Sequence, residues 1–377
     1  MKRSRFWFGF TAAAMAVLVL GVGSAAAADP GDVVIATQDL HKTLVLGDVA
    51  AGNAIGVAYQ KGANSFLRWS TDDGQTFSAD WPLREGRPSK SPRLASCGEW
   101  MWATSVWRTT SGSSRVTVDY LDVTAPESTD GRFRINDAFW ADVACHGDLV
   151  AVTYSVEAGT MLAVMDGQCS QPCTPAFSSM IAPYADQPMI AAVDDGFVVT
   201  WPVLGLAVQH FAVSGSGQSI DVSPDPAATL LAGKHPYSPV IAGDGSRVVI
   251  AYSLHGQTHM RISEDRGQTF GPRIIVSYFS TNTCCAGSAP DSVDARNGRI
   301  LVEVARGMGD PPAISTIGKF TRNDGDRWIT TTSHGGGTQI GVLLPGLAAE
   351  AWDAHFYADK IYGNVPQEIG FRTTSVP

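Results

Sequence analysis

Side chains that could exchange protons or bind anions directly follow three apolar runs of the sequence. Arg108 ends one run, His255 ends a second, and Asp353 and His355 follow a third. A histidine gains or loses a proton near neutral pH, and an arginine can pair with a carboxylate through two parallel hydrogen bonds. Tryptophan and tyrosine side chains in the same runs can stack on the C–H face of a sugar ring. This combination is typical of a site for an acidic sugar.

The candidate site residues fall into groups by the chemistry that each side chain offers. The candidate catalytic residues are His255, His355, Asp353 and Tyr357. The candidate substrate-binding residues are Arg93, Trp107, Arg108, Trp201, His235, Tyr252 and Arg306. An arginine could neutralise a sugar carboxylate, and a His or Tyr could exchange a proton. Hydrolysis would instead need two carboxylates roughly 5–10 Å apart, and the candidates are Glu157, Asp291, Asp310 and Asp353.

These residues need a scaffold that brings separate strand ends together, and internal repeats can supply it. Seven segments share an apolar run, a turn with a glycine, and an alternating run rich in β-branched and aromatic residues. Their turn glycines are Gly52, Gly98, Gly147, Gly196, Gly245, Gly298 and Gly346, at spacings of 46 to 53 residues. No helical periodicity occurs after the N-terminal segment. A unit of about fifty residues made of short alternating strands is typical of a four-stranded propeller blade.

The repeats therefore predict an all-β fold, a seven-bladed β-propeller. A blade cannot bury both of its faces alone, so the ring must close. Because the last unit is short of one strand, we expect Asp32–Thr37 to pair beside the C-terminal strand near Glu368–Thr373. The segments leading into each first strand and the loops after each second strand would then form the mouth. Aromatic residues near these strand ends could equally fill the space between blades, which is a structural role.

A second motif, S-x-D-x-G-x-T-F, recurs inside the units. Its two full copies are Ser70, Asp72, Gly74, Thr76 and Phe77, and Ser263, Asp265, Gly267, Thr269 and Phe270, with a degenerate copy at Thr321–Trp328. The polar side chains can hydrogen-bond to backbone groups of a turn, and glycine adopts positive φ, so the motif favours a structural role. It resembles the Asp-box, or bacterial neuraminidase repeat, of the sialidase-like β-propellers. In that family the box lies between the third and fourth strands, on the face away from the pocket.

The resemblance implies a carbohydrate-active enzyme with its site at the propeller mouth. In sialidases three arginines hold the substrate carboxylate, a tyrosine activated by a glutamate attacks, and an aspartate serves as acid or base. The residues that could take these roles here are Arg93, Arg108, Arg306 and Tyr357, with Glu350 or Glu303 as the base. The R-I-P tripeptide of the family is absent from the first unit, where residues 41–44 read HKTL.

The resemblance also leaves alternatives open. Sialidases of this type usually have six blades, so a six-bladed sialidase fold is the alternative architecture. Seven-bladed relatives include glycoside hydrolases and polysaccharide lyases that act on acidic glycans, and either reaction is expected here. The alternative function is a non-catalytic propeller that binds a glycan or a protein, because a fold alone does not fix a function.

The chain has six cysteines, Cys97, Cys145, Cys169, Cys173, Cys284 and Cys285. In an exported protein such cysteines favour disulfide bonds. The first two lie one and two residues before the turn glycines of neighbouring units, which predicts a bridge between blades two and three. The next two would close a small loop. The adjacent last pair would either bond to each other or form two separate bridges, for example to Cys169 and Cys173. No paired C-x2-C spacing indicates a zinc site, so we expect no cofactor, while a structural calcium ion stays open.

Residues 1–28 have the pattern of a secretory signal peptide. Lys2, Arg3 and Arg5 precede an apolar run, Phe6–Val22, and a stretch of small residues, Ser24–Ala28. Cleavage after Ala28 would leave residues 29–377 as a single secreted, extracellular propeller domain. The alternative is a retained membrane anchor, because the apolar run comes close to the roughly 20 residues that span a bilayer.

Composition narrows the possible partners. The chain is 44% hydrophobic and 17% charged, which excludes a disordered protein. After residue 28 the net charge is −12, the opposite sign to that of a nucleic-acid-binding surface. A closed ring leaves few free sheet edges, so we expect a monomer whose partner is a glycan or polysaccharide.

Overall fold

The computed structural model describes residues 33–38, 44–83, 89–109, 111–126, 131–168, 173–183, 187–203, 205–226, 229–230, 236–277, 287–308, 313–321, 328–335, 339–344, 347–353 and 367–375. Every regular element in these ranges is a β-strand, as the alternating repeats predict. Within the same ranges, no helix is long and apolar enough to cross a membrane. The segment interpreted as a signal peptide lies outside the described residues.

The strands form seven antiparallel sheets that follow one another around a ring. The first three are β2 (Leu44–Ala51), β3 (Ile55–Lys61), β4 (Asn64–Ser70) and β5 (Trp81–Pro82); β6 (Ser89–Cys97), β7 (Trp100–Arg108), β8 (Ser114–Asp122) and β9 (Gly131–Asn136); and β10 (Ala138–His146), β11 (Leu149–Val156), β12 (Gly159–Asp166) and β13 (Phe177–Pro183). The fourth is β14 (Met189–Val193), β15 (Gly196–Pro202), β16 (Leu206–Ser216) and β17 (Ser219–Pro224), with β18 (Thr229–Leu230) also paired to β16.

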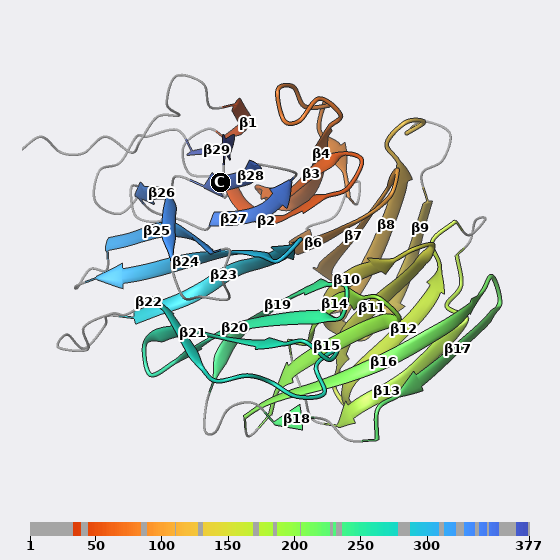
Figure 1. Ribbon diagram of the computed structural model, residues 1–377. Coiled ribbons are helices and arrows are strands. Elements are labelled where there is room, and N and C mark those ends of the chain that lie inside the picture. Colours follow the sequence, from red (N-terminus) through yellow and green to blue (C-terminus); the bar gives the residue numbers. More distant parts are fainter. Residues whose placement is uncertain are drawn as a thin grey trace, which may run out of the picture.

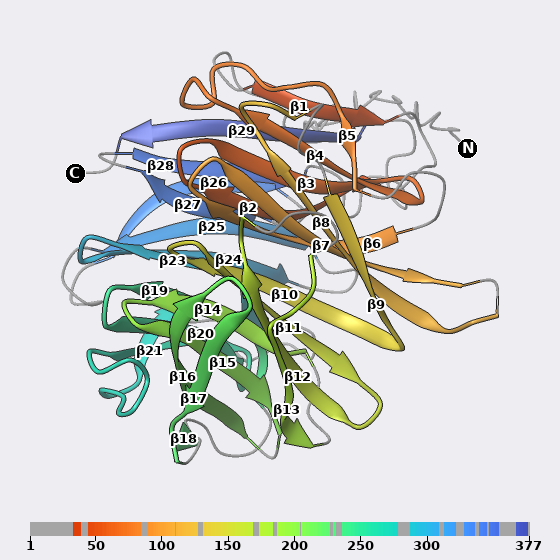
Figure 2. The ribbon, with the colours of Figure 1, turned by 90° about the vertical axis from the view of Figure 1, so that its right-hand side faces the viewer.

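The last three sheets complete the ring. They are β19 (Tyr237–Asp244), β20 (Arg247–Leu254), β21 (Gln257–Ser263) and β22 (Ile274–Ser277); β23 (Gly287–Arg296), β24 (Arg299–Met308), β25 (Ala313–Thr321) and β26 (Ile329–Gly335); and β27 (Gln339–Leu344), β28 (Leu347–Asp353), β29 (Gln367–Ser375) and β1 (Val33–Gln38). Figures 1 and 2 show the sheets in chain order, with the first blade in orange beside the last blade in blue. The molecule is therefore a seven-bladed β-propeller, as the repeats predict, and not the six-bladed alternative.

The ring closes through the two ends of the chain. β1 is the outer strand of the seventh blade and pairs antiparallel with β29, with Val33 opposite Phe371 and Thr37 opposite Glu368. Figure 2 shows these two strands side by side. The predicted pairing between the N-terminal and C-terminal strands is confirmed.

Burial along the strands follows from their place in a blade. The middle strand β20 (RVVIAYSL) has seven buried residues in succession, because both of its faces are covered by neighbouring blades. The outer strand β9 (GRFRIN) instead alternates between partly buried and exposed residues. Continuous burial of the middle strands produces the hydrophobic layers between blades.

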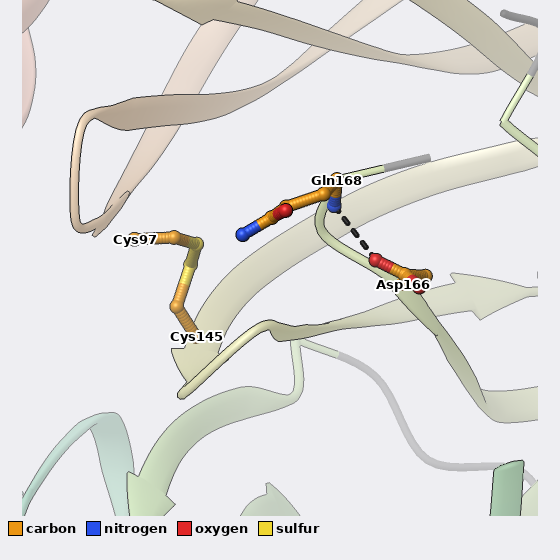
Figure 3. Close-up of a disulfide and its surroundings, with 4 residues drawn as sticks. All are labelled: Cys97, Cys145, Asp166 and Gln168. Atoms are coloured by element: carbon orange, nitrogen blue, oxygen red, sulfur yellow. Dashed lines mark hydrogen bonds between the residues drawn. A yellow bond between two sulfur atoms is a disulfide. The ribbon is translucent and has the colours of Figure 1, made fainter. Parts of the chain in front are cut away.

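A disulfide joins the ends of two first strands. Cys97 at the end of β6 bonds to Cys145 near the end of β10, with Cα atoms 5.5 Å apart. Figure 3 shows this bond beside Asp166 and Gln168, where the Gln168 backbone N–H donates to the Asp166 carboxylate. The predicted bridge between blades two and three is confirmed. Cys173 is also disulfide-bonded, whereas the remaining three cysteines lie outside the described residues.

Candidate functional site

Strand direction defines the two faces of the ring. Each first strand begins on one face and turns into the second strand on the other face. The motif segments 70–77 and 263–270, here named the S-x-D turns, follow the third strands of their blades and therefore lie on the turn face. Accordingly, the Arg266 N–H donates to the carbonyl of Ser246 in the turn between β19 and β20, at 2.8 Å. The opposite face, where the first strands begin, is the mouth of the propeller.

A cavity of about 350 Å³ occupies the mouth, and residues from all seven first strands contribute to its wall. Its polar side chains are Gln60, Ser91, Arg93, Trp140, Gln187, Ser238 and Asp291. A second cavity of about 220 Å³ lies along the axis and is also lined by all seven first strands. Five residues line both cavities, and two of them are charged, Arg93 and Asp291. The other three are Met189, Val240 and Ile340.

Arg93 provides the cationic group of the mouth. Its guanidinium carbon lies 5.4 Å from the centroid of the Trp140 ring, within the range of a cation–π contact. The Trp140 indole N–H donates to the carbonyl of Pro188 at 3.1 Å, which fixes the ring against blade four. Among the residues that the structure describes, no carboxylate forms an ion pair with Arg93 within 4.0 Å. Its charge is thus available to a bound anion.

Unusual backbone conformations aim polar side chains into the mouth. Ser91, Gln187 and Ser238 have φ values of 50°, 49° and 50°, and each directly precedes a proline. The left-handed region is uncommon for residues other than glycine, and a following proline restricts the backbone further. The pairing registers of β6 and β19 shift at the first and third of these positions, as in β-bulges, which can re-aim side chains.

Three aspartates tie neighbouring first strands together along the axis. An aspartate on the first strand of one blade accepts a backbone N–H from the first strand of the next blade, in three blades of the ring. These bonds run from Leu94 N to Asp48 Oδ2 (2.8 Å), from Ile190 N to Asp142 Oδ2 (2.9 Å) and from Leu343 N to Asp294 Oδ2 (2.6 Å). They fix the relative positions of the strands that form both cavities.

Desolvation dominates the electrostatics of these aspartates. Burial raises the pKa of Asp48 to about 7, although the nearby Arg93 charge and two backbone N–H groups act in the opposite direction. Burial also raises the pKa of Asp142, against the same arginine, and the pKa of Asp294. Because a raised pKa means less negative charge at a given pH, these aspartates and the Arg93 guanidinium, which has no ion pair within 4.0 Å among the described residues, make the inner end of the mouth more favourable for an anion than the net charge of the chain suggests.

Two further carboxyl groups lie behind the axial cavity. Glu303 on β24 and Glu350 on β28 are both fully buried. Burial, followed by the charges of Glu350 and Asp291, raises the pKa of Glu303 well above its usual range. Buried titratable groups next to a cavity are typical of functional sites.

The S-x-D turns make one set of hydrogen bonds twice. In the first, Ser70 Oγ donates to Asp72 Oδ1, the Gly74 N–H donates to Ser70 Oγ, and the N–H and hydroxyl of Thr76 donate to the Asp72 carboxylate, at 2.6–2.9 Å. The second copy has equivalent bonds among Ser263, Asp265, Gly267 and Thr269. Hydrogen bonds from Thr76 and Ser70 lower the pKa of Asp72 to about 2. The Asp72 carboxylate therefore stabilises the turn, which lies on the face opposite the mouth.

The candidate site residues differ in burial and in whether they line a cavity. Arg93 lies in the mouth cavity. Trp107, Trp201 and Tyr252 are only 2%, 4% and 1% exposed and pack between strands. Arg108 and His255 are exposed at the mouth-side ends of β7 and β20, outside the walls of the two cavities.

The other candidates fall partly or wholly outside the description. Arg306 lies near the end of β24 and Asp353 ends β28, so the backbone of both residues is on the mouth side of a second strand. Asp310, His235, His355 and Tyr357, together with Cys169, Cys284 and Cys285, lie outside the described residues. Ser91, Gln187 and Ser238 were not among the candidates, although a polar residue before a proline recurs at the start of three first strands. An alignment of the repeats on these prolines would identify the three residues.

No metal centre is present in the part of the chain that the structure describes, since no group of three or more His, Cys, Asp or Glu side chains there could hold an ion. The arrangement instead offers one cation, one indole, neutral hydrogen-bonding groups and one carboxyl in a cavity of about 350 Å³. Such a cavity can bind a small organic anion and exchange a proton with it.

No family model matches the chain. No curated protein matches its sequence. Among solved structures, it is similar to the periplasmic gluconolactonase of Pseudomonas aeruginosa (15% identity, 89% of this chain and 100% of that chain, TM-score 0.51). It is also similar to the β-propeller domain of the Trilobed protease from Pyrococcus furiosus (9% identity, 89% and 95%, TM-score 0.51).

The similar structures include sialidases, one of them a Hadza microbial sialidase (11% identity, 70% of this chain and 63% of that chain, TM-score 0.43). The chain spans 46% of the length of a prolyl endopeptidase that it also matches. At these identities the comparisons establish the propeller fold, which this chain shares with several hydrolases, and nothing about its reaction.

Proposed function

We propose that the protein is a secreted carbohydrate-active enzyme, a sialidase-like glycoside hydrolase or polysaccharide lyase that acts on an acidic glycan at the propeller mouth. The observation that carries this proposal is Arg93, an arginine without an ion-pair partner among the described residues, held on Trp140 in the mouth cavity. Arg binds a sugar carboxylate by charge-assisted hydrogen bonds, and an indole face suits the C–H face of a sugar ring.

The neutral polar groups of the mouth support a sugar rather than a simple inorganic anion. Gln60, Ser91, Gln187 and Ser238 surround Arg93 in the same cavity and can bond to sugar hydroxyl groups. The S-x-D turns support the resemblance to Asp-box propellers, because they lie between third and fourth strands and on the face away from the cavity. The signal-peptide pattern of residues 1–28 supports secretion.

The proposed proton-transfer groups come from the mouth-side strand ends. His255 is exposed at the turn after β20, and the carbonyl of Gly256 next to it accepts the backbone N–H of Ser288 on blade six. This contact holds the turn against the start of β23, at the rim. His355, Asp353 and Tyr357 remain proposed partners on the seventh blade. We further propose that the mature protein is monomeric and needs no cofactor.

The proposal is tested with glycans that contain uronic or sialic acids. Product formation is followed by new reducing ends, which report cleavage by either reaction, and by the absorbance of unsaturated uronates, which only elimination produces. The Arg93→Ala variant should lose about 30- to 150-fold in kcat/KM, because a charge-assisted bond contributes about 2–3 kcal/mol. Arg134→Ala is the matched control, since Arg134 is an exposed arginine on the outer strand of the same blade.

The outcomes separate the two functions. Equal turnover by the Arg93 variant and the wild type would overturn the assignment of the mouth as the site. Glycan binding that depends on Arg93, with no product by either assay, would favour the alternative, a non-catalytic glycan-binding propeller.

A further inference from the structure

Three large apolar side chains are exposed on the mouth side of three consecutive blades. Phe139 is 40%, Val203 is 47% and Tyr237 is 48% exposed. Phe139 lies near the start of β10 on blade three, Val203 follows β15 on blade four, and Tyr237 begins β19 on blade five. Figure 1 shows β10, β14 and β19, the first strands of these blades, next to one another. The three residues are named the rim residues here.

Their position distinguishes the rim residues from the other exposed apolar side chains of the described part. Those are Val34, Met180 and Ile275, and they lie on β1, β13 and β22, the outer strands of their blades. An outer strand has only one neighbouring strand, so solvent exposure of some of its side chains is expected. The rim residues instead lie beside the opening of a cavity. Exposed apolar side chains gathered at such a place are typical of a binding surface.

The backbone directs the two aromatic rim residues outward. Phe139 is the extra residue of a β-bulge in β10, where the pairing register with β11 shifts. Tyr237 pairs with Ser253 on β20 and directly precedes the left-handed Ser238, where the register of β19 shifts. Bulges re-aim side chains and occur next to binding sites. The exposure of these rings is therefore a property of paired strands and not of a loose loop.

The rim residues continue the wall of the mouth cavity. Phe139 directly precedes Trp140, and Tyr237 directly precedes Ser238, and both Trp140 and Ser238 line that cavity. Consecutive Cα atoms are about 3.8 Å apart, so each aromatic residue begins immediately outside the wall. None of the rim residues lines the cavity itself. A ligand that reaches both Arg93 and the rim must therefore extend out of the cavity.

The size of the cavity supports a ligand that is only partly enclosed. Its volume of about 350 Å³ is near the lower end of the range for sites that enclose a drug-sized ligand, roughly 300–1,000 Å³. A phenyl or phenol ring can stack on the C–H face of a sugar, and the hydroxyl groups of a sugar held at an exposed rim can stay hydrated. The rim residues are uncharged, so carboxylates of sugars outside the cavity can also keep their water.

We infer that the rim residues form a platform for the sugars next to the one held in the cavity, so that the ligand is a chain of an acidic polysaccharide and not a single terminal sugar. The inference rests on the proposed function, in which the mouth binds an acidic glycan. Tyr237 lies opposite Ser253, two residues before His255. The platform thus borders the turn that carries a proposed proton-transfer group.

The test compares long and short ligands in the full chain. Native electrophoresis in gels that contain hyaluronan, polygalacturonate or polysialic acid measures polymer binding without turnover, and ligand-observed NMR measures binding of the corresponding disaccharide. Phe139→Ala and Tyr237→Ala should each weaken polymer binding about 3- to 10-fold and leave disaccharide binding unchanged. Arg93→Ala should weaken the binding of both ligands, because Arg93 lies in the cavity.

Matched variants separate stacking from other effects of substitution. Phe139→Tyr and Tyr237→Phe keep the ring and should bind the polymer like the wild type. Met180→Ala and Ile275→Ala remove apolar side chains of similar exposure, 46% and 48%, from outer strands, and neither should change polymer binding. All four positions are exposed, and an unchanged melting temperature verifies that each variant is folded.

Several results would overturn the inference. These are equal polymer affinity of the wild type and both alanine variants, equal losses for polymer and disaccharide, and a wild type that binds none of the three polymers. A dimeric wild type whose alanine variants are monomeric in size-exclusion chromatography, with unchanged polymer binding, would show that the rim is a contact between copies of the chain.

Failure of the proposed function is a separate result. Polymer binding that depends on the rim residues, without any product, would refute an enzyme and support the platform. An effect of Arg93→Ala on turnover, with polymer affinity independent of the rim residues, would support the enzyme and refute the platform.

Discussion

Single residues in the S-x-D turns attach each turn to the preceding blade. Gly74 of blade one has φ +85°, and a Cβ there would collide with the ring of Phe371 in blade seven. Phe77 packs edge-on against the same ring, with centroids 5.0 Å apart. In the second copy, a Cβ on Gly267 would lie 3.3 Å from Val198 of blade four. The motif therefore stabilises both its own turn and the contact between consecutive blades.

Substitution of Gly74 tests this residue-scale role. Gly74→Ala should lower the free energy of unfolding by about 2–4 kcal/mol, because it combines a left-handed backbone with a clash against Phe371. Gly62→Ala is the matched control, since Gly62 has φ +62° and open space around its Cβ position. It should lower the stability by only about 1–2 kcal/mol. Denaturant unfolding measures both, and equal losses would show that the contact with blade seven contributes nothing.

At the scale of elements, the first strands carry both the covalent and the polar links between blades. Cys97 and Cys145 join the ends of β6 and β10 on the turn face. The carboxylate of Asp142, on the same strand β10, accepts an N–H from β14. Such links fix the first strands relative to one another, which a cavity built from seven separate strands requires.

Removal of the disulfide tests the covalent link. The bond closes a segment with a sequence separation of 48 residues, and the chain-entropy model gives about 4 kcal/mol for a loop of this length. Cys97→Ser combined with Cys145→Ser should therefore lower the free energy of unfolding by about 2–4 kcal/mol under non-reducing conditions. Unchanged denaturant midpoints in the double variant and the oxidised wild type would contradict this expectation.

The elements were more predictable from the sequence than the site. The turn glycines and the S-x-D motif share the period of the blades, so they indicate the blade number, the closing strand and the Cys97–Cys145 bond. The mouth depends on which way individual side chains point, and residue type does not decide this. Trp107 is of a residue type expected in a sugar-binding site, but the residue is only 2% exposed. The left-handed Ser91 and Ser238 fall at register shifts of their strands, which simple alternation along a strand cannot anticipate.

At the scale of the whole molecule, the ring depends on a strand from the other end of the chain. β1 covers the edge of β29, and Ile35 on β1 is 1% exposed within the core between the first and last blades. An uncovered β29 would present a free edge, which promotes association between chains. Ring closure therefore affects both stability and the expected monomeric state.

Substitutions at two neighbouring residues of β1 distinguish the effect of ring closure from the general effect of a mutation. Ile35→Ala removes buried contacts and should lower the free energy of unfolding by about 2–4 kcal/mol. Val34→Ala, on the adjacent residue with 42% exposure, should change it by less than about 0.5 kcal/mol. If closure protects the edge of β29, only the Ile35 variant should also form larger species in size-exclusion chromatography at elevated protein concentration. If the Ile35 variant loses stability but does not associate, β29 stays covered when the core beneath β1 is weakened. If the two variants are equally stable, β1 is not needed to hold the ring together.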